Sequence, residues 1–472
     1  MKWINGLGGI DLCTDCELKN DVDYFNENFN LDWISDADTF TKELSDKLKF
    51  IELNRHQGKK YYVSVASKKI GNVKITNEIE YNDFDWKKED LRLLTLFRYW
   101  NIIEYFFPYK YQTDLDWDDV LNKMTPKFLH SKSEQDFHLA MLELVVCIDD
   151  SHADFATDLT NAFFGNYWIP AGFKLMDSTA IITRFYNKGF AKLDDLKIGD
   201  VITKVDGLDV QTIFQKREKY INGSNLSRKK WMAFRSIFNG STNAVEIDYI
   251  RDGTTAKKTL KRYSINDINY TWNGSTEKFK ILDNNIGYVE MTQLKIKDVS
   301  KMMKSLKDTK AIIFDLRYGS DWTLHLISNY INSQKKDFFK ATYPDLSYPG
   351  KFIWRDGYTC GKDGELKYKG NVVLLVGEMS QSIIEFTAMC LQAGDNVTTI
   401  GSQTSGADGT VSPFEMVAGY KTNITGVGIF YPDKTEAQRK GVKIDIVCKP
   451  TIDGITAEKD EVLERALDYI NN

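Results

Sequence analysis

The sequence of 472 residues lacks the motifs that mark several large enzyme classes. It holds no H-E-x-x-H, no G-x-x-x-x-G-K-[ST], and no G-x-G-x-x-G after a predicted strand. A metalloprotease, a P-loop enzyme or a dinucleotide-binding enzyme therefore loses its main support. No apolar run is long enough to span a bilayer, so we expect a soluble protein without a transmembrane segment. The net charge of −5 comes without a basic block, which argues against nucleic acid as the main partner.

Cysteine and histidine, the usual ligands of structural metals, are scarce. Six cysteines are scattered along the chain, and the C-x-x-C of Cys13 and Cys16 has no second pair to complete a zinc site. We expect a local disulfide or two free thiols there, and we predict no metal and no cofactor. Of only five histidines, His152 follows directly on a helical segment in IDDSHADF. A structural histidine at a helix end and a functional base both fit that position.

The remaining composition is that of a globular protein with several domains. Apolar residues make up 42% and charged residues 27% of the chain, which is too long for one simple core. The hydrophobic pattern changes from mixed to helical, then to short strands, and then to strands and helices in turn. We predict an α/β multidomain protein with a mixed N-terminal region (1–85), a helical domain (86–165), a β-rich domain (166–264) and an α/β core (265–472).

The β-rich domain contains the segment AKLDDLKIGDVITKVDGLDV, which resembles the most recognisable part of a PDZ domain. Gly199 permits a sharp entry into the strand, and Val201, Ile202 and Val205 supply apolar side chains for a small core. The resemblance implies a unit that binds extended peptides by adding a strand to a sheet edge. Any other small β domain is the alternative.

A serine stands where a buried strand turns into a helix. The run Val372 to Val376 is apolar throughout, as in a strand covered on both faces, and Ser382 to Gln392 follow with helical spacing. The first turn of a helix offers free N–H groups and a positive dipole end, which stabilise an oxyanion. Capping of the helix by Ser380 or Ser382 is the simpler interpretation. A second apolar strand, AIIFDLR, also ends in polar residues, where α/β sheets gather their chemistry.

The order of these segments resembles that of one family. The chain contains, in this order, a helical region, DSHA, the PDZ-like segment, FDLR, a strand–SQS–helix segment, IGSQTSGADG and QRKGVKIDIVCKPT. The same order is found in the serine peptidases that include the C-terminal processing (tail-specific) proteases and the tricorn-like enzymes. The resemblance covers about residues 90–472 and implies a crotonase/ClpP-like core with an inserted PDZ domain. It also implies a catalytic set: Ser382 as nucleophile with Ser380 as the second choice, and Gly319 and Ile383 as oxyanion donors.

The general base is where the chain departs from the C-terminal processing proteases. They carry a lysine in G-x-x-T-x-G-K-G, where this chain has Ala407, followed by Asp408, a weak base near neutral pH. Tricorn-like members instead use a histidine in an S-H-A context, which His152 matches. Its ordinary pKa near 6.5 suits proton transfer at neutral pH. The resemblance implies further members that orient the ring: Ser151, and Glu436 as the acidic member, for which Gln438 is the alternative that fits the spacing at least as well.

Together these residues and the resemblance imply a serine endopeptidase that cleaves unfolded or C-terminal peptide segments through an acyl-enzyme. Its expected partners are polypeptide substrates, and its oligomeric state stays open. A catalytically inactive, peptide-binding pseudo-protease is the alternative, favoured by the missing lysine and by the bulky pair Asp321-Trp322 after D-L-R. An acyl-CoA enzyme of the crotonase fold would not need the PDZ-like insert.

The N-terminus, MKWINGLGG, lacks the apolar core of a signal peptide. Members of the resembled family are commonly exported, so we expect a protein of the periplasm or cell envelope whose signal has been removed. A cytoplasmic protein is the alternative that the sequence leaves open.

Overall fold

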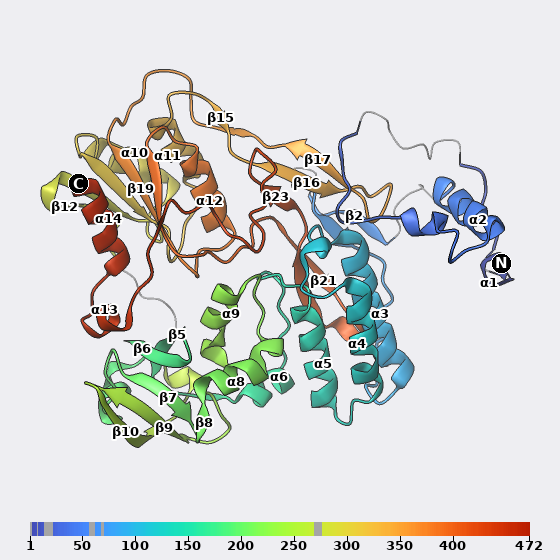
Figure 1. The fold of residues 1–472 in the computed structure, drawn as a ribbon, viewed down its shortest axis with the longest axis horizontal. Helices are drawn as coiled ribbons and strands as arrows, with labels where there is room; N and C mark the ends of the chain where they lie inside the picture. Colours follow the sequence, from blue (N-terminus) through green and yellow to red (C-terminus); the bar gives the residue numbers. More distant parts are fainter. Residues whose placement is uncertain (1, 7, 14–21, 56–61, 68–69, 269–275) are drawn as a thin grey trace.

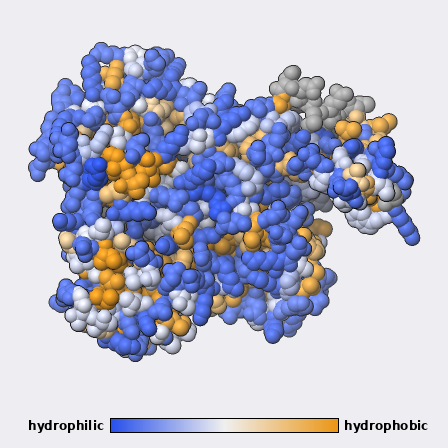
Figure 2. Space-filling view, viewed as in Figure 1, coloured by the Kyte–Doolittle hydropathy of each residue, from blue (hydrophilic) through white to orange (hydrophobic). Residues whose placement is uncertain are grey.

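The structure, a computed structural model, describes residues 2–6, 8–13, 22–55, 62–67, 70–268 and 276–472. Figure 1 shows a small N-terminal region, a bundle of nearly parallel helices, a β-rich unit, and an α/β core that holds the C-terminus. Polar side chains cover most of the face seen in Figure 2, with small apolar areas between them. The architecture is therefore a mixed α/β fold of several parts, as predicted.

The helical bundle completes its core with residues from both ends of the chain. The N-terminal region contains α1 (Lys2–Gly6), β1 (Tyr24–Phe25), α2 (Lys42–Leu53), β2 (Val63–Val65) and β3 (Val73–Ile75). The bundle contains α3 (Glu89–Phe106), α4 (Trp117–Leu129), α5 (Glu134–Val146) and α6 (Asp158–Phe164). Ser133 caps α5 by accepting a hydrogen bond from Asp136 N at 3.1 Å. The buried core of the bundle also includes Phe25, Phe352 and Phe430. The bundle is therefore packed against the rest of the molecule.

The β-rich unit is built on an antiparallel sheet in the order β10-β9-β7-β6-β5, with β8 paired to β7. Its elements are β4 (Tyr167–Trp168), β5 (Ala171–Met176), β6 (Thr179–Phe185), α7 (Lys188–Leu193), β7 (Val201–Val205), β8 (Leu208–Asp209), α8 (Val210–Arg217), α9 (Leu226–Met232), β9 (Ala244–Arg251), β10 (Thr254–Lys261) and β11 (Tyr263–Ser264). Ile202 and Val205 lie in its buried core. Gly199 has a φ of +87°, and a Cβ there would lie 2.8 Å from Cα of Thr456, so glycine permits this approach to the α/β core.

The α/β core contains a six-stranded sheet in the order β12-β13-β14-β19-β20-β24. These strands are β12 (Phe279–Leu282), β13 (Ile286–Glu290), β14 (Ala311–Asp315), β19 (Asn371–Val376), β20 (Val397–Gly401) and β24 (Ile446–Val447). All neighbours pair in parallel except β12, which is antiparallel to β13. The predicted apolar strand is β19, and it lies between β14 and β20 with both faces buried.

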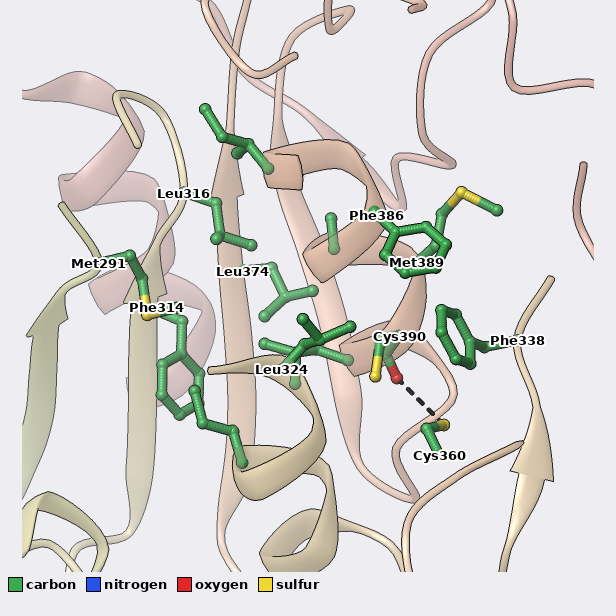
Figure 3. Close-up of a cluster of buried hydrophobic side chains, with 14 of the residues drawn as sticks. Met291, Phe314, Leu316, Leu324, Phe338, Cys360, Leu374, Phe386, Met389 and Cys390 are labelled. Atoms are coloured by element: carbon green, nitrogen blue, oxygen red, sulfur yellow. Dashed lines mark hydrogen bonds between the residues drawn. The ribbon is translucent and has the colours of Figure 1, made fainter. Parts of the chain in front are cut away.

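Helices cover both faces of this sheet. Phe314 and Leu374 pack on the side of α11 (Leu324–Ile331) and α12 (Ile383–Gln392), in the cluster drawn in Figure 3. Their neighbours Ile313 and Val373 point to the opposite face and pack with residues of α14 (Glu461–Asn471). The other elements of this part are α10 (Val299–Ser305), β15 (Lys336–Asp337), β16 (Lys340–Pro344), β17 (Phe352–Asp356), β18 (Thr359–Cys360), β21 (Val411–Glu415), β22 (Lys421–Thr425), β23 (Gly428–Phe430) and α13 (Ile452–Thr456).

The parallel register brings three loops to one edge of the sheet. The loops that follow β14, β19 and β20 all leave from the C-terminal ends of neighbouring strands. Functional groups of open α/β sheets gather at this edge. A functional site is therefore expected at this edge, in the loops 316–323, 377–382 and 402–409.

Candidate active site

Ser382 occupies a strained turn between β19 and α12. Its φ of 57° and ψ of −122° lie outside the regions that residues other than glycine favour, at a cost of about 1–3 kcal/mol. Ser382 N donates to Ala407 O at 3.0 Å and to Glu385 Oε2 at 3.3 Å, and these bonds hold the turn. The side chain is half-buried at the very start of the helix, beside the N–H of Ile383. The strain thus presents a hydroxyl next to the positive end of α12.

Ser380, the second candidate nucleophile, has a structural role. It is fully buried, and its hydroxyl donates to Leu316 O at 2.8 Å and accepts from Gly377 N at 3.1 Å. These bonds tie the loop after β19 to the end of β14. Ser382 is therefore the better placed of the two serines for chemistry.

His152 is held by a chain of hydrogen bonds that ends on a buried carboxylate. Its Nδ1 lies 2.8 Å from Thr425 Oγ1, and Thr425 Oγ1 donates to Asp150 Oδ1 at 2.9 Å. Asp150 also accepts from Thr425 N at 2.7 Å and from His152 N at 3.1 Å. Because the threonine proton points to the carboxylate, its oxygen accepts from Nδ1–H, which leaves the lone pair on Nε2. Nε2 is buried and has no hydrogen-bond partner among the described residues.

The charge state of His152 follows from its surroundings. Burial lowers its pKa below the ordinary value of 6.5, Asp150 opposes this effect, and the guanidinium of Arg228 adds to the decrease. The ring is therefore neutral at neutral pH. Its Nε2 is in the form that accepts a proton.

The loops of the serine and of the histidine contact each other directly. Gln381, which precedes the serine, donates from Nε2 to Ser151 O at 3.4 Å and accepts at Oε1 from Ser405 Oγ at 3.1 Å. Ser405 Oγ also lies 3.1 Å from Ser151 Oγ. Ser151 is further paired with Ser224 of the β-rich unit, since each N–H donates to the other hydroxyl at 2.8 Å. Segments far apart in the sequence thus meet around the two candidate catalytic side chains.

Glu385 organises the loop that includes Ala407. Its buried carboxylate accepts from Thr404 Oγ1 at 2.5 Å, from Gly406 N at 2.8 Å and from Ala407 N at 3.0 Å. Burial raises the pKa of Glu385, and burial together with Glu385 raises the pKa of Asp408 well above its usual range. The neutral acid is therefore the favoured form of Asp408, which makes it a poor candidate for the base.

The sequence of the core matches one known family. Residues 285–448, which span all strands of the core sheet except β12, match the family model described as peptidase family S41. The core is therefore similar to the peptidases of family S41. The predicted enzyme class, a serine peptidase, is thereby confirmed. No curated protein sequence matches the chain.

Solved structures of similar fold extend over most of the chain. Mature CPAF covers 81% of this chain and 98% of its own, with a TM-score of 0.65 and 13% identity. CPAF complexed with lactacystin gives a TM-score of 0.63 at 14% identity, with 81% and 99% coverage. A putative peptidase from Parabacteroides merdae ATCC 43184 gives 0.50 at 14% identity, with 80% and 96% coverage. At these identities the likeness concerns the fold alone.

The predicted oxyanion donors of the peptidase come from two neighbouring loops. Ile383 is the first residue of α12, so its N–H has no preceding turn of helix to bond. Gly319 lies in the loop after β14, where a Cβ would approach Thr292 Cγ2 to 2.8 Å. The close packing shows why a small residue suits position 319.

The predicted orienting groups make their hydrogen bonds elsewhere. The hydroxyl of Ser151 bonds to Ser224 and Ser405, as described above. Glu436 accepts from Tyr111 OH at 3.0 Å and pairs with Lys440 Nζ at 2.7 Å. Gln438 is buried, and its amide has no hydrogen-bond partner within the described part of the chain. None of the three is hydrogen-bonded to the imidazole in the described residues.

Sequence reasoning missed Thr425, which is hydrogen-bonded to the imidazole, and Asp150, which is hydrogen-bonded to that threonine. Asp150 stands two residues before His152 in the same IDDSHADF segment, and an acidic residue so close to a candidate base was the available signal. Thr425 lies 273 residues further along the chain. Nothing in the sequence around it points to the histidine.

Three further observations concern metal ligands, membrane-length helices and the cysteines. Across the described ranges, no group of three or more His, Cys, Asp or Glu side chains is arranged to hold a metal ion. None of the helices in those ranges is both long and apolar enough to cross a membrane. Cys13 is disulfide-bonded, whereas Cys16 lies outside the described residues.

Proposed function

We propose that the protein is an endopeptidase that cleaves polypeptides with Ser382 as nucleophile and His152 as general base. One observation carries the proposal. The buried Nε2 of His152 has no hydrogen-bond partner within the described part of the chain, and its Nδ1 is bonded to Thr425. The preceding residue, Ser151, accepts a hydrogen bond from Gln381, the neighbour of Ser382. A histidine so arranged can take the serine proton without losing any other hydrogen bond.

The reaction follows from these roles. Ser382 Oγ attacks the peptide carbonyl carbon while Nε2 accepts its proton, and the oxyanion accepts hydrogen bonds from the N–H groups of Ile383 and Gly319. The imidazolium then gives the proton to the leaving amine. The C–N bond breaks, the amine departs, and the acyl group stays bonded to Ser382 Oγ as the acyl-enzyme. Water, deprotonated by the same Nε2, releases the acyl group and restores the serine.

In this proposal Thr425 and Asp150 orient the base in place of Ser151 and Glu436. Support comes from the 2.8 Å contact between Nδ1 and Thr425 Oγ1 and from the two hydrogen bonds that Thr425 donates to Asp150. The carboxylate stabilises the imidazolium through the hydroxyl while the charge exists. Thr425 and Asp150 together therefore orient the ring and stabilise its charged form, as a directly bonded aspartate does in other Ser–His enzymes.

We further propose a crotonase/ClpP-like core and a PDZ-like unit at 166–264 that binds extended or C-terminal segments of unfolded substrates along β5. This strand ends its sheet and pairs only with β6 in the described residues, so its outer edge offers backbone groups to a peptide. Lys174 of β5 pairs with Glu378 Oε1 at 2.6 Å, in the loop before Ser382. A peptide on this edge would thus run toward the serine. Peptide-induced protection of β5 amides from hydrogen exchange in Ser382→Ala is the expected result, and unchanged exchange would contradict it.

Export to the periplasm or cell envelope is the location we propose. The disulfide at Cys13 supports it, because disulfides persist in oxidising compartments. Cell fractionation with an antibody against the full chain tests this location, and recovery in the cytoplasmic fraction would contradict it.

The catalytic proposal is tested by covalent labelling. A fluorophosphonate probe should modify the folded wild-type protein at one peptide that contains Ser382, as read by mass spectrometry. Ser382→Ala should not be labelled, His152→Ala should be labelled far more slowly, and Ser227→Ala should behave as wild type. Labelling that persists in Ser382→Ala would overturn the assignment. Absence of both labelling and turnover in the wild type would favour the peptide-binding pseudo-protease.

A further inference from the structure

Two buried cysteines contact each other between helix α12 and the short outer strand β18. Cys390 lies in α12, about two turns after Ser382, and Cys360 is the last residue of β18. The thiol of Cys360 donates to Cys390 O at 3.5 Å, the contact drawn as a dashed line in Figure 3. Both residues are free cysteines, with exposed fractions of 1% and 0%. The fold thus brings two thiols from different segments of the chain together at one point.

The surroundings of Cys360 favour its thiolate. Asn332 Nδ2 donates to Cys360 Sγ at 3.9 Å and to Ala393 O at 3.1 Å. A hydrogen bond with the Cys390 side chain lowers the pKa of Cys360, and the charge of Lys336 adds to the decrease. Burial and the neighbouring Cys360 raise the pKa of Cys390 well above its ordinary value. Because the thiolate is the nucleophile in disulfide exchange, Cys360 is the sulfur that attacks first.

Strand β18 is the side from which an oxidant can reach the two thiols. It has two residues and pairs only with β15 in the described part of the chain. Tyr358 and Thr359, which precede Cys360, are exposed, and so is Lys362 just after it. Helix α12, in contrast, is buried over most of its length. Local opening of the short ladder therefore uncovers Cys360 while the helix stays packed on the core sheet.

We propose that Cys360 and Cys390 are an oxidation site, at which a small disulfide oxidant, RSSR, converts the two thiols into a disulfide between β18 and α12. The Cys360 thiolate attacks one sulfur of RSSR, and the first RS⁻ leaves with the electron pair of the S–S bond. The deprotonated sulfur of Cys390 then attacks Cys360 Sγ and displaces the second RS⁻. The two cysteines lose two electrons, and their two protons end on two molecules of RSH.

The disulfide would tie a connecting segment to the α/β core. The chain before Cys360 contains β16 and β17, and Phe352 of β17 packs into the core of the helical bundle. A covalent bond from Cys360 to α12 holds the end of this segment against the core sheet, and it also restricts the unfolded chain. We expect the oxidised protein to be the more stable form. This inference does not depend on the proposed function of Ser382 and His152.

Peptide mapping of the full chain tests the site directly. The purified protein is incubated with glutathione disulfide, free thiols are alkylated in denaturant, and the unreduced digest is analysed by mass spectrometry. We expect one linked pair of peptides that contain Cys360 and Cys390, with Cys147 and Cys448 linked to neither. Alkylated or glutathionylated Cys360 and Cys390, in protein whose Cys13 remains disulfide-bonded, would overturn the inference.

The melting temperature provides a second readout. Oxidised wild type should melt about 3 °C or more above the form reduced with dithiothreitol. Because the reductant also cleaves the disulfide at Cys13, Cys360→Ser and Cys390→Ala are each measured in both states, and their differences should be smaller by this amount. Cys448→Ser is the matched control and should behave as wild type. Equal differences in wild type and in both variants would contradict the proposed link, and the mapping of the wild type needs no variant.

Discussion

Thr425 Oγ1 lies 2.8 Å from Nδ1 of His152 and donates its proton to Asp150 at 2.9 Å. A neutral hydroxyl thus stands between the imidazole and the carboxylate, while a direct Nδ1–Oδ1 contact is longer, at 3.8 Å. The arrangement sets the tautomer of the ring without a direct ion pair. It also makes the activity depend on a residue of β22 that approaches the histidine only in the folded molecule.

The removal of either partner of the catalytic pair should have the same effect as the removal of both. We expect Ser382→Ala and His152→Ala each to lower kcat by about 10³-fold or more on a denatured protein substrate, and the double variant to be no worse, because the pair acts as a unit. Steady-state kinetics of the three variants tests this. Substantial kcat in His152→Ala would contradict the role of the histidine.

The threonine should matter through its hydroxyl. Thr425→Val keeps the shape but leaves Nδ1–H without an acceptor, so we expect kcat to fall about 10²-fold with a smaller change in KM. Thr425→Ser keeps the hydroxyl and should retain most of the activity. Similar losses in both variants would indicate a packing role instead, and thermal unfolding of each variant would show it.

The pH profile should report the lowered pKa of His152. Because only the neutral ring accepts a proton, kcat/KM should rise with pH through one ionisation that lies below 6.5 and then stay level. Arg228 contributes to that lowering, so Arg228→Gln should move the rise to higher pH, measured on a neutral peptide. Arg235→Gln is the matched control. A shift to lower pH in Arg228→Gln would contradict the sign.

Glu385 should be required for the turn that carries the nucleophile. Glu385→Ala removes the acceptor of Gly406 N and Ala407 N, which stay buried, and the second acceptor of Ser382 N, which keeps its bond to Ala407 O. We expect a loss of about 2–4 kcal/mol in the free energy of unfolding together with loss of activity. Glu365, which is exposed, provides the control Glu365→Ala. Chemical denaturation followed by circular dichroism gives the free energy of unfolding of both variants, and a peptidase assay gives their activity.

The paired hydroxyls of Ser151 and Ser224 should align the base across the two parts of the molecule. Ser224→Ala removes the acceptor of Ser151 N, so we expect kcat to fall about tenfold with little change in KM. In Ser227→Ala, which loses only a 3.4 Å bond to Gln403 O, kcat should stay near wild type. A rise in KM at constant kcat would instead make Ser224 part of the substrate-binding surface.

The local order of the chain could be predicted because neighbouring residues decide it. The apolar run of β19 and the helical spacing of α12 are properties of short segments, and so is the placement of Ser382 between them. His152 was found in the same way, since a rare histidine followed a helix in a short motif. Strands and helices of this length carry their own pattern of apolar side chains, and the family of the core follows from the order of such segments.

Tertiary structure alone decided which groups form hydrogen bonds around Ser382 and His152. The hydrogen bond of Ser380 depends on the carbonyl of Leu316, just after the neighbouring strand β14, and the orientation of the His152 ring depends on Thr425. Ser151 turned out to bond to Ser224, 73 residues away. Hydrogen-bond partners across such separations are set by how sheets and loops pack, and polar side chains of one type look alike in the sequence whether they meet a ring, a carbonyl or solvent.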